Sequence, residues 1–129
     1  MRIVPFLLIS CIVLFSSNAA FAQKVTFNVN LKPQLEDSTF IPGRDQLKVI
    51  GSVQPISLAT PYYLTDQEPI DSVYSVTINF SPRYRNQTII YNFEMTVNYR
   101  KIAEDLEREL YLQQGESTLD ALYFNAFAW

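Results

Sequence analysis

The side chains that most often carry out catalysis are scarce in this chain. It contains no histidine, which removes the most common general base, the usual serine–histidine–aspartate triad and most zinc sites. Its one cysteine, Cys11, lies in an apolar N-terminal segment, so we expect no thiol nucleophile and no thiolate metal site in the folded part. Three glycines are too few for a glycine-rich phosphate loop. Any catalysis would have to come from carboxylates.

Two glutamates have a spacing that invites a catalytic interpretation. Glu107 and Glu109 are two residues apart and would lie on one face of a strand. A pair of carboxylates on opposite sides of a glycosidic bond can hydrolyse it, but neighbours on one strand do not face each other across a cleft. We therefore expect solvated surface charges beside Arg108, in a protein that is not an enzyme.

A second acidic group, Asp66, Glu68 and Asp71, lies in the loop "TDQEPID". Calcium requires several oxygen ligands and usually a glycine at the sharp turn of its loop, and this loop has no glycine. The sequence favours an acidic structural turn here, with no metal site and no cofactor.

Four tyrosines close to turn signals are the best candidates for ligand binding: Tyr62, Tyr63, Tyr84 and Tyr99. The first two precede the acidic loop, Tyr84 lies between two arginines in "SPRYRNQ", and Tyr99 is the last residue of the longest apolar–polar alternation. An aromatic ring beside a cation on a loop can stack on a sugar ring or meet a protein partner. Packing in or at the rim of the core is the alternative for Tyr63, and for Tyr84 both interpretations stay open.

Strands must position these side chains, because apolar and polar residues alternate with a period of two. The alternation covers residues 24–31, 74–80 and 88–99, which are separated by proline-rich loops. Strands with one polar face favour antiparallel sheets, so the predicted fold is all-β. At about 3.4 Å per residue the run 88–99 would span roughly 40 Å, so we expect a bulge, a bend or an extension beyond the sheet.

Residues 99–124 allow two interpretations. Glu104 and Arg108 are four residues apart, as in helical ion pairs. A hairpin of residues 108–112 with residues 118–124, with Gly115 in the turn, fits the alternation that follows. From Glu107 on we predict the hairpin, and a single helical turn over residues 102–105 remains an alternative.

The N-terminal segment has the pattern of a secretory signal peptide. Arg2, an apolar run over residues 3–17 and the small residues of "AFA" lie in the order that signal peptidase requires. We predict a signal peptide over residues 1–22 and one domain over residues 23–129, periplasmic or extracellular, with no membrane span. The alternative is a lipoprotein signal in "LISC", with a lipid attached at Cys11.

The charge balance bears on the partners. Thirteen acidic and ten basic residues give a net charge of −3, and the basic residues form no patch in the sequence. Nucleic acid and anionic membrane surfaces attract basic proteins, so neither is an expected partner.

The order of the motifs "VTFNVNL", "FIPGRDQLKVIGS", "YYLTDQEPIDSVYSVTINF", "IIYNFEM" and "RELYLQQGESTLDALYFNA" resembles the starch-binding-type carbohydrate-binding domains of Bacteroidota secreted proteins. Such domains often precede esterase or serine-hydrolase domains. The resemblance covers nearly all of residues 23–129 and implies an immunoglobulin-like antiparallel β-sandwich of about seven strands. It also implies an α-glucan-like polysaccharide as the ligand.

The resemblance directs attention to the corner "GSVQPI" at residues 51–56. In the family this corner is commonly followed by a tryptophan whose flat face stacks on a sugar ring, and a second aromatic lies just past the "YNF" strand. Ile56 lies where that tryptophan would be, and Tyr99 matches the second aromatic. Isoleucine offers no planar stacking surface. We therefore expect a degenerate sugar site and a corner that packs Val53 or Ile56 inward.

The last residues of the sequence add a possible interface, because Phe127 and Trp129 are apolar residues at a terminus. Together these features predict a non-catalytic exported binding module of the starch-binding type. The alternative is a protein-interaction or assembly module of the cell envelope, which binds a protein partner or catalytic subunit through an edge strand or the apolar C-terminus.

Overall fold

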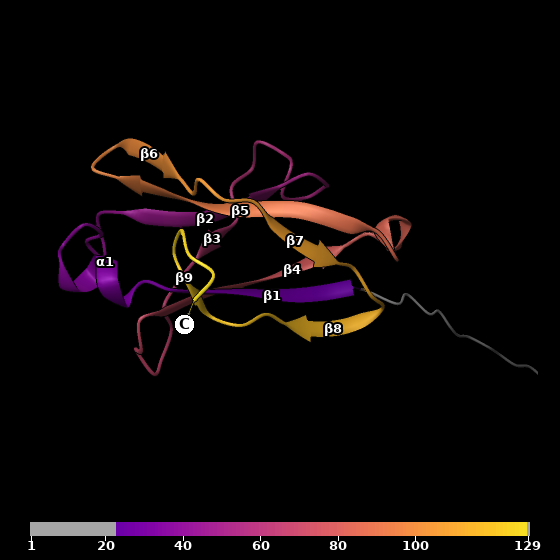
Figure 1. The fold of residues 1–129 in the computed structure, drawn as a ribbon, viewed down its shortest axis with the longest axis horizontal. Coiled ribbons are helices and arrows are strands. Elements are labelled where there is room, and N and C mark those ends of the chain that lie inside the picture. The colour runs from indigo at the N-terminus through magenta and orange to yellow at the C-terminus, as the bar shows by residue number, and fades with distance from the viewer. Residues whose placement is uncertain (1–22, 129) are drawn as a thin grey trace, which may run out of the picture.

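The computed structural model describes residues 23–128, and these residues form two stacked sheets (Figure 1). The predicted signal peptide, the lipid alternative at Cys11 and the interface residue Trp129 lie outside the described residues. The prediction of an all-β sandwich is confirmed, with nine strands in the described part where about seven were expected. No helix within residues 23–128 is long and apolar enough to cross a membrane.

The first sheet, sheet A, is built around β1 (Gln23–Asn30). On one side β1 pairs along its whole length with the antiparallel strand β4 (Val73–Phe80). On the other side it pairs in parallel with β8 (Gly115–Thr118) and then with β9 (Leu122–Tyr123). The end of the chain therefore completes the sheet that its first strand begins.

The second sheet, sheet B, is built around β5 (Thr88–Val97). One side of β5 pairs with β2 (Gln46–Gly51), which also pairs with the short strand β3 (Tyr63–Leu64). The other side pairs with β6 (Arg100–Ala103) and then with β7 (Arg108–Tyr111). β5 runs along most of the length of the molecule, and the β5–β6 hairpin projects at one end of it (Figure 1).

The core follows from the period-two alternation. Every second residue of β1 is buried between the sheets, as predicted, and β5 follows the same pattern from Ile89 to Met95, while Val97 is only partly buried. Phe27 lies at the centre, edge-to-face with Tyr91 at 5.0 Å, Phe80 at 6.2 Å and Phe93 at 6.4 Å between ring centroids. Such aromatic contacts stabilise the core beyond the area that they bury.

The structure corrects both the predicted hairpin and the alternative helical turn in residues 99–124. The segment 102–105 is not a helical turn, because β6 and β7 both pair with β5 around a break at Glu104. The predicted hairpin is also wrong, because β7 belongs to sheet B and β8 to sheet A. Between them Leu112 is fully buried, and its backbone pairs with Asn86 and Gln87. Burial of Leu112 carries the chain from one sheet to the other instead of turning it back.

Two short helices complete the fold. The helix α1 (Lys32–Glu36) follows β1, and the 3-10 helix η1 (Pro82–Tyr84) precedes β5. Each has a proline in its first turn, where the missing N–H needs no partner and the fixed φ suits a helix.

Candidate functional site

The predicted ligand-binding tyrosines do not form one site. Tyr84 lies in η1 just before β5, and Tyr99 lies in the turn just after it. The ten residues of β5 separate the two ends by roughly 34 Å at about 3.4 Å per residue. One sugar ring cannot contact both side chains, so each tyrosine must be judged by its own surroundings.

Tyr84 mainly packs. Its side chain is partly buried against the core, and the Arg83 guanidinium carbon lies 5.2 Å from the centre of its ring. Ser81 caps η1 by accepting a hydrogen bond from the Arg83 N–H. These contacts favour the structural interpretation of Tyr84.

Tyr62 and Tyr63 point in different directions, as neighbours near a strand must. Tyr62 is partly buried against the core, and its carbonyl accepts a hydrogen bond from the Val49 N–H at 3.2 Å. Tyr63 pairs with Lys48 in the β2–β3 ladder, and 40% of its surface is exposed. Of the pair, Tyr63 is the residue whose ring is available to a ligand.

A cavity of about 360 Å³ lies beside Tyr63, between the start of β2 and the end of β3. The buried side chains Phe40, Leu47, Leu64 and Tyr74 contribute an apolar lining, and Gln46, Thr65 and Asp66 contribute polar groups. This volume is at the small end of the range for small-molecule sites, which typically combine an apolar surface with a few polar groups.

The loop beside this cavity is fixed by a buried carboxylate. The Asp45 side chain is fully buried and accepts hydrogen bonds from Arg44 and from the backbone N–H groups of Ile41 and Asn98. The Arg44 hydrogen bond, aided by these N–H groups, holds the pKa of Asp45 well below its usual range against the opposing effect of burial. Asp45 therefore ties the α1–β2 loop to the β5–β6 turn.

Tyr74 lines this cavity as a neutral phenol, the form that tyrosine has at neutral pH. Burial raises the pKa of Tyr74, and the negative charge of Asp66 raises it further. A neutral phenol in the cavity wall can donate a hydrogen bond to a ligand oxygen.

Tyr99 is the most exposed of the predicted site residues that the structure describes. Asn98 and Tyr99 form the two-residue turn of the β5–β6 hairpin, with φ of 50° and 68°, and 94% of the surface of Tyr99 is exposed. The Asn98 N–H donates to Asp45 at 3.0 Å, so the turn is anchored to the body of the protein. The ring is held out on a fixed support.

The Gly51–Ile56 corner packs inward, as predicted. Ile56 is only 2% exposed, and the Gly51 N–H donates to its carbonyl at 3.2 Å. A Cβ on Gly51 would lie 2.6 Å from the Ile56 Cδ1 and 2.9 Å from the Ile90 carbonyl oxygen, so only glycine fits. Ser52 extends the ladder by exchanging hydrogen bonds with the Ile90 backbone.

A second, more open cavity of about 380 Å³ lies beside this corner, on the outer face of sheet B. Ile50 and Ile90 contribute apolar surface, and Asn92 and Glu107 contribute polar groups. Tyr99 lies beyond the opposite end of β5, because Gly51 pairs with Tyr91 while the turn follows Val97. The two aromatic positions suggested by the resemblance therefore do not meet at this corner.

The acidic loop is closed by its own hydrogen bonds. Asp66 accepts from the backbone N–H groups of Asp71 at 3.3 Å and Ser72 at 2.8 Å. Within residues 23–128 no group of three or more histidine, cysteine, aspartate or glutamate side chains is arranged to hold a metal ion. These bonds give the loop the structural role expected from its sequence.

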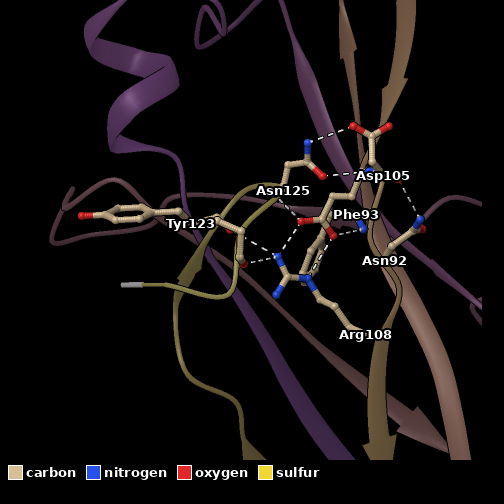
Figure 2. Close-up of polar contacts among 8 residues, drawn as sticks. Asn92, Phe93, Asp105, Arg108, Tyr123 and Asn125 are labelled. Carbon is tan, nitrogen blue, oxygen red and sulfur yellow. Dashed lines mark hydrogen bonds and ion pairs between the residues drawn. The ribbon is translucent and has the colours of Figure 1, made fainter.

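A buried polar cluster around Glu104 and Arg108 was not recognised as a site from the sequence. Glu104 lies at the break between β6 and β7, and its carboxylate pairs with Arg108 through contacts of 3.0 Å and 2.5 Å (Figure 2). The side chains are 0% and 4% exposed respectively, so the ion pair is buried. The four-residue spacing suggested a helix, but here it spans a break between two strands.

This ion pair also holds the C-terminal segment. Arg108 donates to the carbonyls of Tyr123 at 3.2 Å and Ala126 at 3.1 Å, and Glu104 accepts from the Asn125 N–H at 2.6 Å (Figure 2). Glu104 also accepts from the Phe93 N–H at 3.0 Å, which replaces a backbone partner at the break. We call Glu104, Arg108 and these partners the Glu104–Arg108 hub.

The predicted interface residue Phe127 belongs to the surroundings of this hub. It is 65% exposed, and the Arg108 guanidinium carbon lies 5.5 Å from the centre of its ring and 5.4 Å from that of Phe93. Phe127 therefore contributes a cation–π contact to the fold as well as an exposed apolar surface.

No protein-family model matches this chain, and no curated protein is significantly similar to it.

Proposed function

We propose that this protein is a non-catalytic, exported binding module of the starch-binding type, and that it binds an α-glucan-like polysaccharide at Tyr63 and the cavity beside it. The observation that carries the proposal is the position of Tyr63, which is 40% exposed next to a cavity of about 360 Å³ with apolar and polar walls. A sugar ring needs this combination, because its axial C–H groups are apolar and its hydroxyl groups form hydrogen bonds.

The strand order supports the immunoglobulin-like part of the proposal. In that fold one sheet of the variable type carries the order C′-C-F-G, and the other sheet contains the neighbours B and E. Here β3-β2-β5-β6 matches the first order, and β1-β4 matches the second pair. The position next to β1, where a first strand A would pair, is filled by β8 and β9.

A sugar at Tyr63 would find specific partners. Its C–H face would stack on the exposed ring, while its hydroxyl groups would reach Gln46, Thr65 and Asp66 at the cavity wall. The second cavity, beside Gly51, has isoleucines in place of an aromatic platform and would add little stacking. A single aromatic platform gives weak binding to one sugar unit, so a polymer with many repeated units is the expected ligand.

Affinity electrophoresis tests the proposal. The protein should be retarded in gels that contain amylose or pullulan, and less in xylan. Tyr63→Ala should remove the retardation, whereas Tyr111→Ala is the matched control, since Tyr111 is 50% exposed on β7 and does not line the cavity. Migration that is unaffected by all three polysaccharides would refute polysaccharide binding. An equal loss of retardation in Tyr63→Ala and Tyr111→Ala would refute the site at Tyr63.

Export has its own test. The mass of the protein recovered from the cell envelope or medium should correspond to a chain that begins at Gln23. A lipid-modified chain that begins at Cys11 would support the lipoprotein alternative, and an uncleaved chain in the cytoplasm would refute export.

A further inference from the structure

The outer edge of β6 is unpaired. All four residues of β6 are exposed, and no strand within residues 23–128 pairs with the side that faces away from β5. Val97 and Arg100 close a two-residue turn, so they form a hydrogen-bonded pair, and every second pair along the β5–β6 ladder is hydrogen-bonded in the same way. The Glu104 N–H bond to the Phe93 carbonyl fits this alternation. The N–H and C=O groups of Lys101 and Ala103 therefore point to the free edge.

The adjoining turn contains an unusual residue. Two-residue turns with positive φ at both positions favour Asn-Gly, and here tyrosine stands where glycine is preferred. A left-handed conformation costs a non-glycine residue roughly 1–2 kcal/mol. Since 94% of the surface of Tyr99 is exposed, intramolecular packing does little to offset this cost. Strain of this kind at an exposed side chain points to a binding role.

The charge of the edge selects the partner. Arg100 and Lys101 follow Tyr99 directly, and neither takes part in an ion pair within the described residues, in a chain whose net charge is −3. Pairing of β6 with β6 of a second copy would bring four cations together, which disfavours self-association. An acidic strand would instead be attracted.

The shape of the surface favours a protein over a glycan. The hairpin projects from one end of the molecule (Figure 1), and Tyr99 in its turn is 94% exposed and lines neither of the two cavities described above. Tyrosine and arginine are enriched among the residues that contribute most to protein–protein binding, and a free edge offers main-chain hydrogen bonds only to another strand.

We propose that β6 and the Asn98–Tyr99 turn form a docking edge for an extended acidic segment of a partner protein, which adds as a further strand beside β6. The N–H and C=O groups of Lys101 and Ala103 pair with the backbone of this segment. Arg100 and Lys101 attract its carboxylates, and Tyr99 packs on an apolar side chain at its end. This edge is separate from the polysaccharide site at Tyr63 and does not depend on it.

A display library of random linear peptides, selected on the intact protein, tests the proposal. The enriched peptides should carry adjacent acidic residues, because Arg100 and Lys101 are neighbours on β6 and point to opposite faces of the sheet. A labelled consensus peptide should bind with a measurable change in fluorescence anisotropy. Ala103→Pro removes the outward N–H without removing a bond to β5, and should weaken binding by about tenfold or more. Charge reversal in Lys101→Glu should weaken it and remove its salt dependence.

The controls separate binding from folding. Tyr99→Gly relieves the strained φ, so it should weaken peptide binding without loss of stability. Lys24→Glu reverses an exposed charge on β1, in the other sheet, and should leave binding unchanged. A peptide consensus without acidic residues would overturn the proposal. So would a peptide that binds the wild type, Ala103→Pro and Tyr99→Gly with equal affinity. Concentration-dependent dimerisation that Ala103→Pro abolishes would also overturn it, since the occupant would then be a second copy.

Discussion

Replacing Arg108 with methionine should destabilise the fold far more than removal of an ordinary ion pair. Methionine keeps an unbranched apolar side chain but removes the guanidinium group. The Glu104 carboxylate, 0% exposed, would keep only the N–H groups of Phe93 and Asn125, and the carbonyls of Tyr123 and Ala126 would each lose a donor.

The structure sets the size of the effect. Breaking a buried ion pair by removing one partner costs about 3–5 kcal/mol, because a charge is left buried and uncompensated. The matched control is Lys48→Met, which removes the cation of the Lys48–Glu94 pair. That pair is 3.4 Å long and its side chains are 22% and 14% exposed, and Glu94 Oε1 is buried with no hydrogen-bond partner. Its loss should therefore cost about 1–2 kcal/mol, less than the loss of Arg108, whose carboxylate partner is fully buried.

Urea unfolding followed by circular dichroism measures both costs. Adding Glu104→Gln to Arg108→Met should recover part of the loss, because the unpaired charge disappears, and the double-mutant cycle should give a coupling of about 1–3 kcal/mol. Hydrogen exchange should also show faster exchange in residues 122–128 of Arg108→Met, since the hub holds this segment. A free-energy loss for Arg108→Met no larger than that for Lys48→Met would refute the role of the hub.

Three further predictions concern stability at other positions. Tyr99→Gly should stabilise the protein by about 0.5–1 kcal/mol in urea unfolding, because glycine accepts φ of 68° without strain. Gly51→Ala should destabilise it by roughly 1–3 kcal/mol through the contact with Ile56, and Ile56→Val, which removes the Cδ1, should restore part of that loss. Asp45→Asn should destabilise the protein at pH 7, with a difference from the wild type that shrinks as the pH falls below about 4. The folded-state pKa of Asp45 is lowered by Arg44 and backbone N–H groups, so its stabilisation is complete above the unfolded-state pKa and lost toward acid pH; an unchanged difference at pH 2.5 and pH 7 would contradict this assignment.

The strands could be predicted from the sequence because alternation is a local property. The runs that contain Phe27, Ile78 and Phe93 bury most of their alternate apolar side chains, as their patterns require. The exceptions are Val76 and Val97, which are partly buried, and Tyr99, which lies in the turn and is 94% exposed. The direction of Tyr63 also follows from its neighbour, since Leu64 is buried and adjacent residues of a strand point to opposite faces.

The pairing of the strands could not be predicted in the same way. Residues 108–111 and 115–118 both have strand character, but only the burial of Leu112 shows that the chain changes sheets between them. The Glu104–Arg108 spacing was ambiguous for a related reason. On a helix, side chains four residues apart lie close together. The break between β6 and β7, which both pair with β5, brings these two side chains together as well. The separation of Tyr84 and Tyr99 follows from the extended run between them, but the cavity beside Tyr63 does not, because residues from several distant segments line it.

Because of the Glu104–Arg108 hub, the apolar C-terminal segment that was predicted as an interface also contributes to the stability of the fold. Phe127 is exposed, but it stacks on Arg108, and the segment before it supplies β9 to sheet A and two carbonyls to the guanidinium group. Removing this end would therefore weaken the fold and any binding surface together, so loss of binding after truncation would not identify an interface there. The β5–β6 turn should lack this coupling, because Tyr99→Gly is predicted to stabilise the fold. If Tyr99→Gly is more stable than the wild type and still loses partner binding, the loss is explained by the missing tyrosine side chain and not by unfolding. The β5–β6 hairpin is therefore the surface at which effects on binding and on folding can be measured separately.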